Sequence, residues 1–154
     1  MSDAGSLASE LLYQRSFVIR GNDYDHGGEA AAQVKAILKQ IGIAPELIRR
    51  LSIANFEAEM NATMYAYEAR LELSVFSNAV RVVVSDHGPG IPDIGWALQE
   101  GNSTATPEMR ARGFGAGLGL PNIKRNSDEF AIESTVGSGT TLRYAVFING
   151  RPGS

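Results

Sequence analysis

The sequence predicts an α/β fold, a two-layer sandwich in which a mixed, mostly antiparallel sheet packs on about three helices. Two observations carry this prediction. Apolar residues recur at three-and-four spacing over two long segments, as in helices with one buried face, and they alternate with polar residues over short segments, as in half-buried strands. The 154 residues are enough for one domain with its own core.

The chain is expected to open with a tail and a strand. Residues 1–15 are small, polar and mixed, and they predict an N-terminal tail or arm. The β-branched and aromatic run 16–20 predicts the first strand, and the turn-forming cluster 21–23 ends it. The single domain is therefore expected over 16–149, and the polar residues 150–154 are expected to form a C-terminal tail.

Two helices are expected next. The first covers 28–40, with Asp25 placed to cap its start and Gly42 placed to stop it. The second runs from Glu46 to about Arg70. Its expected buried stripe consists of Leu47, Leu51, Ala54, Ala58, Ala62 and Tyr65.

A hairpin is expected after the long helix. Apolar residues alternate over 71–75 and again over 80–84, and Ser77-Asn78 lies between the two runs. The second strand of this hairpin leads directly to Asp86.

The remaining elements are shorter. One helical turn is expected over 94–98, and the aperiodic Gly, Ser, Thr and Pro-containing run 99–112 predicts a loop, so that 94–112 together form a lid over the site. A helix is expected over 121–125. Strand patterns at 130–134 and 142–148 predict a terminal hairpin.

Composition narrows the classes of function. The net charge of −3 and the absence of a basic cluster argue against a nucleic-acid partner. No run approaches the roughly 20 apolar residues of a membrane span. The chain contains no cysteine, which excludes a thiolate metal site and is consistent with the cytoplasm.

The long helix carries a candidate polar pair. Glu57 and Asn61 are four residues apart and so project from nearly one line along the helix, whereas Glu59 projects almost opposite. Beside a buried stripe, a carboxylate and an amide each need a partner. The alternative is two exposed polar residues on a solvated face, which is the commoner situation for these residue types.

Two glycine-containing stretches are candidates for close contact with a ligand. After the strand 80–84 the chain reads Asp86-x-Gly88-x-Gly90-Ile91, where the glycines permit a close approach of something that is not protein. Near the C-terminus, Gly139 is followed by Thr140, whose hydroxyl is expected at the mouth of the sheet.

A third stretch predicts phosphate binding. Glycines alternate at Gly113, Gly115, Gly117 and Gly119, with Leu118 between the last two, and a helical pattern follows. Free backbone N–H groups at a helix start bind anions. A flexible linker is the alternative. The spacings of the dinucleotide-binding fingerprint and of the P-loop are both absent, which disfavours a nicotinamide oxidoreductase and a P-loop ATPase.

Taken together, Glu57-x-x-x-Asn61, Asp86-x-Gly88-x-Gly90, the glycines of 113–119 and Gly137-x-Gly139-Thr140 resemble the ordered boxes of the Bergerat-fold (GHKL) ATP-binding superfamily. The short length and the run 117–130 are similar to its anti-sigma-factor and stressosome-type switch serine kinases.

The resemblance implies a role for each box. Asp86 would accept the adenine amino proton with Thr140 assisting through water, and Gly88, Gly90 and Ile91 would lie against the base. Asn61 would hold Mg²⁺, and Glu57 would be the general base. The phosphates of ATP or ADP would lie under the glycines, including Gly113, Gly115, Gly117, Leu118 and Gly119.

The resemblance also implies an activity: an ATP- and Mg²⁺-dependent serine/threonine kinase acting on a STAS-domain antagonist and regulating transcription by partner switching. Relatives imply a homodimer and contact with a sigma factor or other regulator. Two alternatives stay open, a non-catalytic nucleotide-gated anti-sigma module and a free-standing ATPase. Candidate contacts to the γ-phosphate, or simply solvated cations, are Arg110, Arg112, Lys124 and Arg125.

Overall fold

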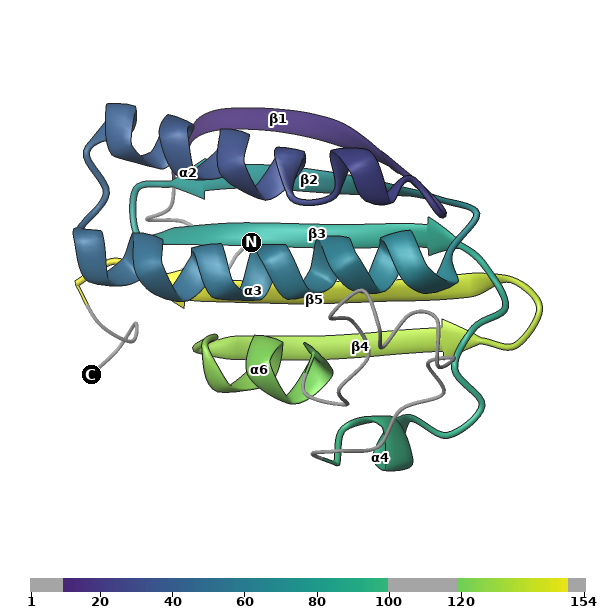
Figure 1. Cartoon of the computed structure of the whole chain (residues 1–154). Helices are drawn as coiled ribbons and strands as arrows, with labels where there is room; N and C mark the ends of the chain where they lie inside the picture. The colour runs from purple at the N-terminus through teal and green to yellow at the C-terminus, as the bar shows by residue number, and fades with distance from the viewer. Residues whose placement is uncertain (1–9, 100–118, 150–154) are drawn as a thin grey trace.

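The computed structural model describes residues 10–99 and 119–149 and shows a sheet with its three longest helices on one face (Figure 1). The strands are β1 (Leu11–Arg20), β2 (Glu68–Phe76), β3 (Ala79–His87), β4 (Glu129–Thr135) and β5 (Gly139–Phe147). The helices are the 3₁₀ turn η1 (Tyr24–His26), α2 (Glu29–Ile41), α3 (Pro45–Tyr65), α4 (Ile94–Ala97) and α6 (Gly119–Arg125).

The sheet has the strand order β1-β2-β3-β5-β4, so β3 is its central strand. All four pairings are antiparallel, which agrees with the predicted mostly antiparallel sheet and removes its expected mixed character. The α/β two-layer architecture is confirmed, and both predicted hairpins are present, with β2 joined to β3 and β4 joined to β5. The central strand places Asp86 at one end of the sheet.

Two element boundaries differ from the prediction. The first strand begins at Leu11, because residues 11–15 pair with the end of β2 and are therefore not part of a tail. The long helix ends at Tyr65 instead of Arg70, because residues 68–70 pair with both β1 and β3. In each case the boundary is set by strand pairing across the sheet. The sequence of one segment alone does not reveal that pairing.

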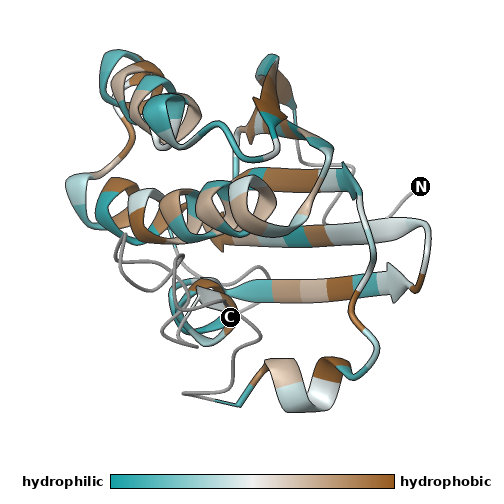
Figure 2. Ribbon diagram, turned by 45° about the vertical axis from the view of Figure 1, so that its right-hand side comes forward, coloured by the Kyte–Doolittle hydropathy of each residue, from teal (hydrophilic) through white to brown (hydrophobic). Residues whose placement is uncertain are grey.

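Helix α3 packs on the sheet through a row of alanines. Ala54, Ala58, Ala62 and Ala66 follow at intervals of four residues, and all are buried in the main core. Side chains four residues apart form a ridge along a helix, and a ridge of methyl groups lets the helix backbone lie close to its neighbour. Of the predicted stripe, Leu51 is also buried and Leu47 and Tyr65 are partly buried. Figure 2 shows these layers from the side.

A buried carboxylate of α3 binds the N-terminus of helix α2. Glu59 is 3% exposed, and its two oxygens accept hydrogen bonds from the backbone N–H groups of Ala31 at 2.8 Å and Ala30 at 3.2 Å. These are among the first N–H groups of α2, which have no partner within the helix. The expectation that Asp25 caps this helix is wrong, since Asp25 lies in η1 and Gly28 is the N-cap residue.

The C-terminus of α2 matches the prediction. Gly42 adopts a φ of 98°, and its N–H bonds back to the carbonyls of Leu38 and Lys39. A left-handed residue at this position is favourable for glycine and strained for any residue with a Cβ. Within the described residues, none of the helices has the length and apolar character needed to cross a membrane.

We expect Glu59→Ala to lower the free energy of unfolding by about 1–3 kcal/mol, because it leaves two buried N–H groups without an acceptor. Chemical denaturation of the variant and its parent measures this difference. The matched control is Asp25→Ala, the cap that the sequence had predicted, which should change stability by less than about 0.5 kcal/mol. Equal losses from the two variants would contradict the assignment of the cap.

Candidate functional site

The end of β3 and the turn between β4 and β5 meet around Asp86. Asp86 is half-buried, and its Oδ1 accepts a hydrogen bond from the backbone N–H of Thr140 at 3.0 Å. Its Oδ2 accepts no hydrogen bond from the described residues. Among residues 10–99 and 119–149, one carboxylate oxygen of Asp86 is thus fixed by the protein and the other has no donor.

Glycine is required where the two segments touch. A Cβ on Gly139, whose φ is 148°, would lie 2.0 Å from the backbone oxygen of Asp86. A Cβ on Gly90, whose φ is 77°, would lie 2.4 Å from the backbone oxygen of Thr135. Both distances are far below van der Waals contact, and both φ values disfavour L side chains. The predicted glycines are therefore needed for backbone-to-backbone packing.

A hydroxyl network closes the same corner. The Ile91 N–H donates to Ser134 Oγ at 2.7 Å, and Ser134 Oγ is 2.8 Å from Thr140 Oγ1. The backbone N–H of Gly137 donates to the carbonyl of Pro89 at 2.9 Å. Residues 86–91 are thereby held against the hairpin turn. Ser134 was not predicted as part of the site, and its place at the end of an alternating strand gave no sign of this contact.

Burial changes the acidity of this corner. Withdrawal from water raises the pKa of the Asp86 carboxyl above its ordinary value, and this effect outweighs the opposing contributions of the Thr140 N–H and of His87. An ionised Asp86 thus lacks part of its solvation in the folded protein, and a hydrogen-bond donor from a ligand would supply the missing partner.

The second part of the site lies along α3. Gly88 packs against the C-terminal end of this helix, where a Cβ would lie 3.1 Å from Ala66 Cα and 3.2 Å from the Tyr65 carbonyl. Counting back by four residues gives Asn61 and then Glu57, each about 6 Å further along the helix axis. The Asp86 corner and the Glu57/Asn61 pair therefore form one row along the helix.

Glu57 and Asn61 point toward the start of α6. A Cβ placed on Gly119 would lie 3.8 Å from Glu57 Oε1 and 3.9 Å from Asn61 Oδ1. Both side chains are partly buried, so the alternative of two fully solvated residues is wrong. The carboxylate oxygen and the amide oxygen face the same point in space. Such a pair of oxygens suits a hard cation such as Mg²⁺ together with additional ligands.

Several predicted site residues fall outside the described part of the chain. These are Gly113, Gly115, Gly117 and Leu118 of the glycine run, and the cations Arg110 and Arg112. Gly119 is described, and it begins α6.

Sequence reasoning missed Asn122, which contacts Glu57 directly. Asn122 Nδ2 donates to Glu57 Oε2 at 3.0 Å, and Arg125 Nη1 donates to Asn122 Oδ1 at 2.7 Å. No local sequence pattern indicates this contact. In the structure, Asn122 is a partly buried amide among the buried residues Leu120, Pro121 and Ile123, and such an amide needs a polar partner.

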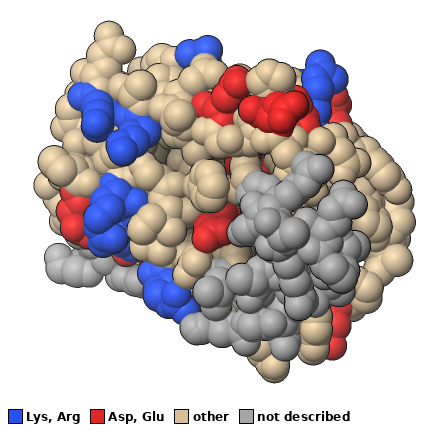
Figure 3. Space-filling model, viewed as in Figure 1, with Lys and Arg blue, Asp and Glu red and all other residues tan. Residues whose placement is uncertain are grey.

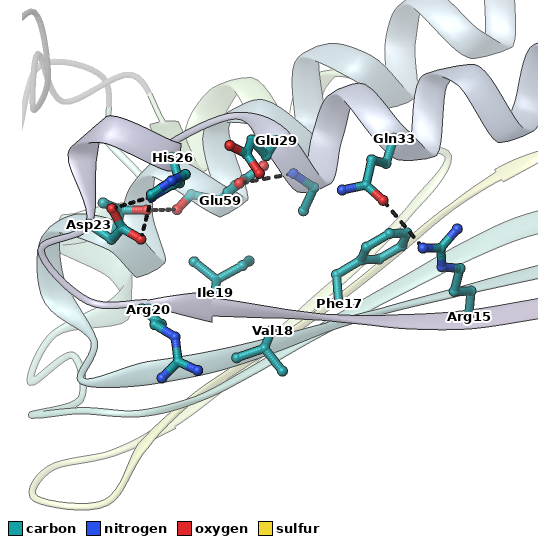
Figure 4. Close-up of a pocket in the computed structure, with 12 residues that line it drawn as sticks. Arg15, Phe17, Val18, Ile19, Arg20, Asp23, His26, Glu29, Gln33 and Glu59 are labelled. Atoms are coloured by element: carbon teal, nitrogen blue, oxygen red, sulfur yellow. Dashed lines mark hydrogen bonds and ion pairs between the residues drawn. The ribbon is translucent and has the colours of Figure 1, made fainter.

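The opposite side of α3 borders a separate pocket of about 400 Å³ between β1 and α2 (Figure 4). Glu59 and Thr63 reach it from α3, and Asp23 and His26 form a hydrogen-bonded pair at 2.8 Å beside it. The hydrogen bond with the Asp23 carboxylate raises the pKa of His26 above its ordinary value. The Glu59 carboxylate is already occupied as the cap of α2, and we assign this pocket no ligand.

Charges on the helical face are unevenly distributed. Lys and Arg gather on the left of this face in Figure 3. Exposed cations on the three helices include Lys39 of α2, Arg49 of α3 and Lys124 of α6.

Within residues 10–99 and 119–149, no three His, Asp or Glu side chains are grouped as a metal site.

The stability of Asp86→Asn should depend on pH differently from that of the parent protein. A raised pKa means that the Asp86 contribution to stability is fully present below the ordinary value of 3.8 and is lost as pH rises through the folded-state pKa. Because asparagine does not titrate, the variant should gain stability relative to the parent across this window. Urea denaturation over a pH series measures the trend, and a pH-independent difference would contradict it.

Comparisons with known proteins agree with the geometry. RsbT from Bacillus subtilis, a serine/threonine-protein kinase, is 30% identical over 119 residues, which cover 74% of this chain and 84% of RsbT. An anti-sigma F factor from Caldanaerobacter subterraneus subsp. tengcongensis is 31% identical over 124 residues, covering 77% of this chain and 83% of that protein.

A solved structure shares the fold. A chain in the crystal structure of the SiaB–SiaC complex from Pseudomonas aeruginosa superimposes with a TM-score of 0.59 at 16% identity, covering 88% of this chain and 89% of that chain. Residues 22–146 match the family model described as the histidine kinase-like ATPase domain. This range includes Glu57, Asn61, Asp86 and Thr140. The chain belongs to the histidine kinase-like ATPase domain family.

Proposed function

We propose that this protein is an ATP- and Mg²⁺-dependent serine/threonine kinase that phosphorylates a STAS-domain partner. The observation that carries the proposal is the row along α3, in which Glu57 and Asn61 face Gly119 and the Asp86 corner adjoins the helix end. The family relationship supports ATP as the ligand, and the similarity to RsbT supports phosphotransfer to a protein hydroxyl.

The Asp86 corner would bind adenine. With Oδ1 engaged by the Thr140 N–H, Oδ2 is left to accept a hydrogen bond from the exocyclic amino group of the base. A Cβ on Gly88 would lie 3.2 Å from Asp86 Oδ1 and would fill space beside this carboxylate. Glycine leaves that space open. Thr140 would assist through water, and Gly90 and Ile91 would line the edge of the base. This arrangement would recognise the base and leave the phosphates directed along α3.

Asn61 would hold Mg²⁺ through its Oδ1, which lies beside Glu57 Oε1 at the start of α6. An amide oxygen is a suitable ligand for this ion, which usually completes its coordination with phosphate oxygens and water. When bound, Mg²⁺ would neutralise charge that develops on the phosphates.

Glu57 would act as the general base. As the oxygen of a serine or threonine hydroxyl forms a bond to the γ-phosphorus of ATP, its proton passes to a carboxylate oxygen of Glu57. The bond between the γ-phosphorus and the β–γ bridging oxygen breaks, and ADP leaves. The glycine run 113–119 would bind the phosphates, and Lys124 or Arg125 would add positive charge nearby.

The partner would be a small STAS-domain antagonist in the cytoplasm, and phosphorylation would change which regulator, such as a sigma factor, is free. The relatives named RsbT and anti-sigma F factor support a role in partner switching. We also propose a homodimer, by analogy with the family alone.

Glu57→Gln should lower the rate of phosphotransfer by about 10²–10⁴-fold, which is the usual contribution of a general base. Nucleotide affinity and partner capture should remain, because the amide preserves the shape of the side chain. The measurement is transfer from γ-labelled ATP to a panel of STAS proteins. The matched control is Glu46→Gln at the exposed start of the same helix, which should transfer phosphate at the parental rate.

Each rival activity gives a different result in that assay. A nucleotide-gated binding module would capture a partner with no labelled product, and Glu57→Gln would behave like the parent. A free-standing ATPase would release phosphate without any partner. Tight ATP binding with no transfer to any STAS protein would overturn the kinase proposal.

Asp86→Asn should weaken ATP binding at least about tenfold, the equivalent of one lost hydrogen bond to a charged group. The asparagine can still accept from the Thr140 N–H through Oδ1. Its NH₂ group then takes the place of Oδ2, so that two donors, this NH₂ and the adenine amino group, would face each other. Isothermal titration calorimetry with ATP and Mg²⁺ measures the change, and Asp25→Asn in η1 is the control. Unchanged affinity would remove the adenine assignment.

A further inference from the structure

Glu57 has one protein partner within the described residues. Its Oε2 accepts the hydrogen bond from Asn122 Nδ2 at 3.0 Å, across the contact between α3 and α6. No other described side chain or backbone N–H donates to this carboxylate. Among the described residues, a single amide from a different helix therefore sets its orientation.

The orientation of that amide is itself fixed by chemistry. An asparagine side chain can turn to exchange its oxygen and nitrogen, and only its neighbours decide which atom points where. Arg125 can only donate hydrogen bonds, and its Nη1 lies 2.7 Å from Asn122 Oδ1. The oxygen of Asn122 must therefore face Arg125, and the nitrogen must face Glu57.

We propose that Asn122 is a positioning residue that orients the Glu57 carboxylate for proton transfer, with Arg125 fixing the direction of the amide. This inference rests on the proposed kinase function. With Oε2 engaged by Asn122, Oε1 is left on the side of Gly119 and Asn61. Oε1 is then the atom that receives the hydroxyl proton as the new bond to the γ-phosphorus forms and ADP departs.

The contact matters because a general base acts only within hydrogen-bond reach of the proton that it accepts. A free glutamate side chain samples several rotamers, and only some of them direct an oxygen toward the substrate. Arg125, Asn122 and Glu57 are linked in series by hydrogen bonds. The bond from Asn122 restricts the rotamers of the Glu57 side chain, which the backbone of α3 alone does not do.

Asn122→Leu tests the proposal because leucine keeps a similar shape and removes the donor. We expect kcat for transfer to the STAS substrate to fall roughly tenfold, with the KM for ATP nearly unchanged, since a base is needed for the chemical step and not for binding. Arg125→Gln should produce a smaller loss in the same direction. An unchanged kcat for Asn122→Leu would overturn the positioning role.

The matched control is Asn126→Leu, an asparagine one turn further along the chain. Asn126 Nδ2 donates to the backbone carbonyl of Asn122 at 2.9 Å, whereas the donor to Glu57 is the side chain of Asn122. Asn126→Leu should cost some stability and leave kcat at the parental level. A loss of kcat equal to that of Asn122→Leu would show that both changes merely disturb α6, and this would also overturn the proposal.

A second measurement does not depend on activity. Exchanging the two groups as Glu57→Gln with Asn122→Asp keeps a hydrogen bond with its direction reversed. Glu57→Gln alone can still accept from Asn122 through the amide oxygen, whereas Asn122→Asp alone removes the donor and places two carboxylates against each other. Unfolding free energies of the four proteins should show that the double variant is more stable than the sum of the single effects. Additive effects would mean that the contact is absent and would overturn the inference even with an active parent. Coupling in a parent that transfers no phosphate would instead defeat the proposed function.

Discussion

The close packing of α3 on the sheet is the constraint on which the rest of this structure depends. The row Ala54, Ala58, Ala62 and Ala66 allows this approach, and a buried hydrogen bond of 2.6 Å from the Tyr144 hydroxyl to Asn55 Oδ1 fixes the helix to β5. With the helix fixed, its two flanks serve different purposes. One flank directs Glu57 and Asn61 toward α6, and the other directs Glu59 to the start of α2.

The two carboxylates of α3 show how position decides the role of a residue. Glu57 and Glu59 are separated by one residue and have the same chemistry. Glu59 is fully engaged by the backbone of α2 and has become part of the framework. Within the part of the chain that the structure describes, Glu57 has one oxygen engaged by Asn122, and in the proposed mechanism the other accepts the hydroxyl proton. A carboxylate whose hydrogen bonds are all satisfied by the protein stabilises the fold, and one that is partly satisfied can act on a ligand.

The sequence predicted most elements of this fold because their signals are local. The hairpin at Ser77-Asn78, the stop at Gly42 and the stripe of α3 all depend on residues close together in the chain. Where contacts between distant segments decided the outcome, prediction failed: β1 begins at Leu11 because of β2, and α2 is capped by Glu59 instead of Asp25. The same division holds at the site. Sequence motifs indicated Glu57, Asn61 and Asp86 as candidates, and their functional roles remain predictions. Ser134 and Asn122 are recognisable only from their partners across the fold.

The tight contact between the Asp86 corner and the hairpin turn limits how this protein can change. At Gly90 and Gly139 even a methyl group would collide with backbone atoms. Mutation therefore cannot adjust the shape of this corner gradually at these positions. Under the proposed assignment of adenine to this corner, a change in base preference would have to come from positions other than these two glycines. The backbone contact that places Asp86 thus confines such a change to side chains that do not take part in it.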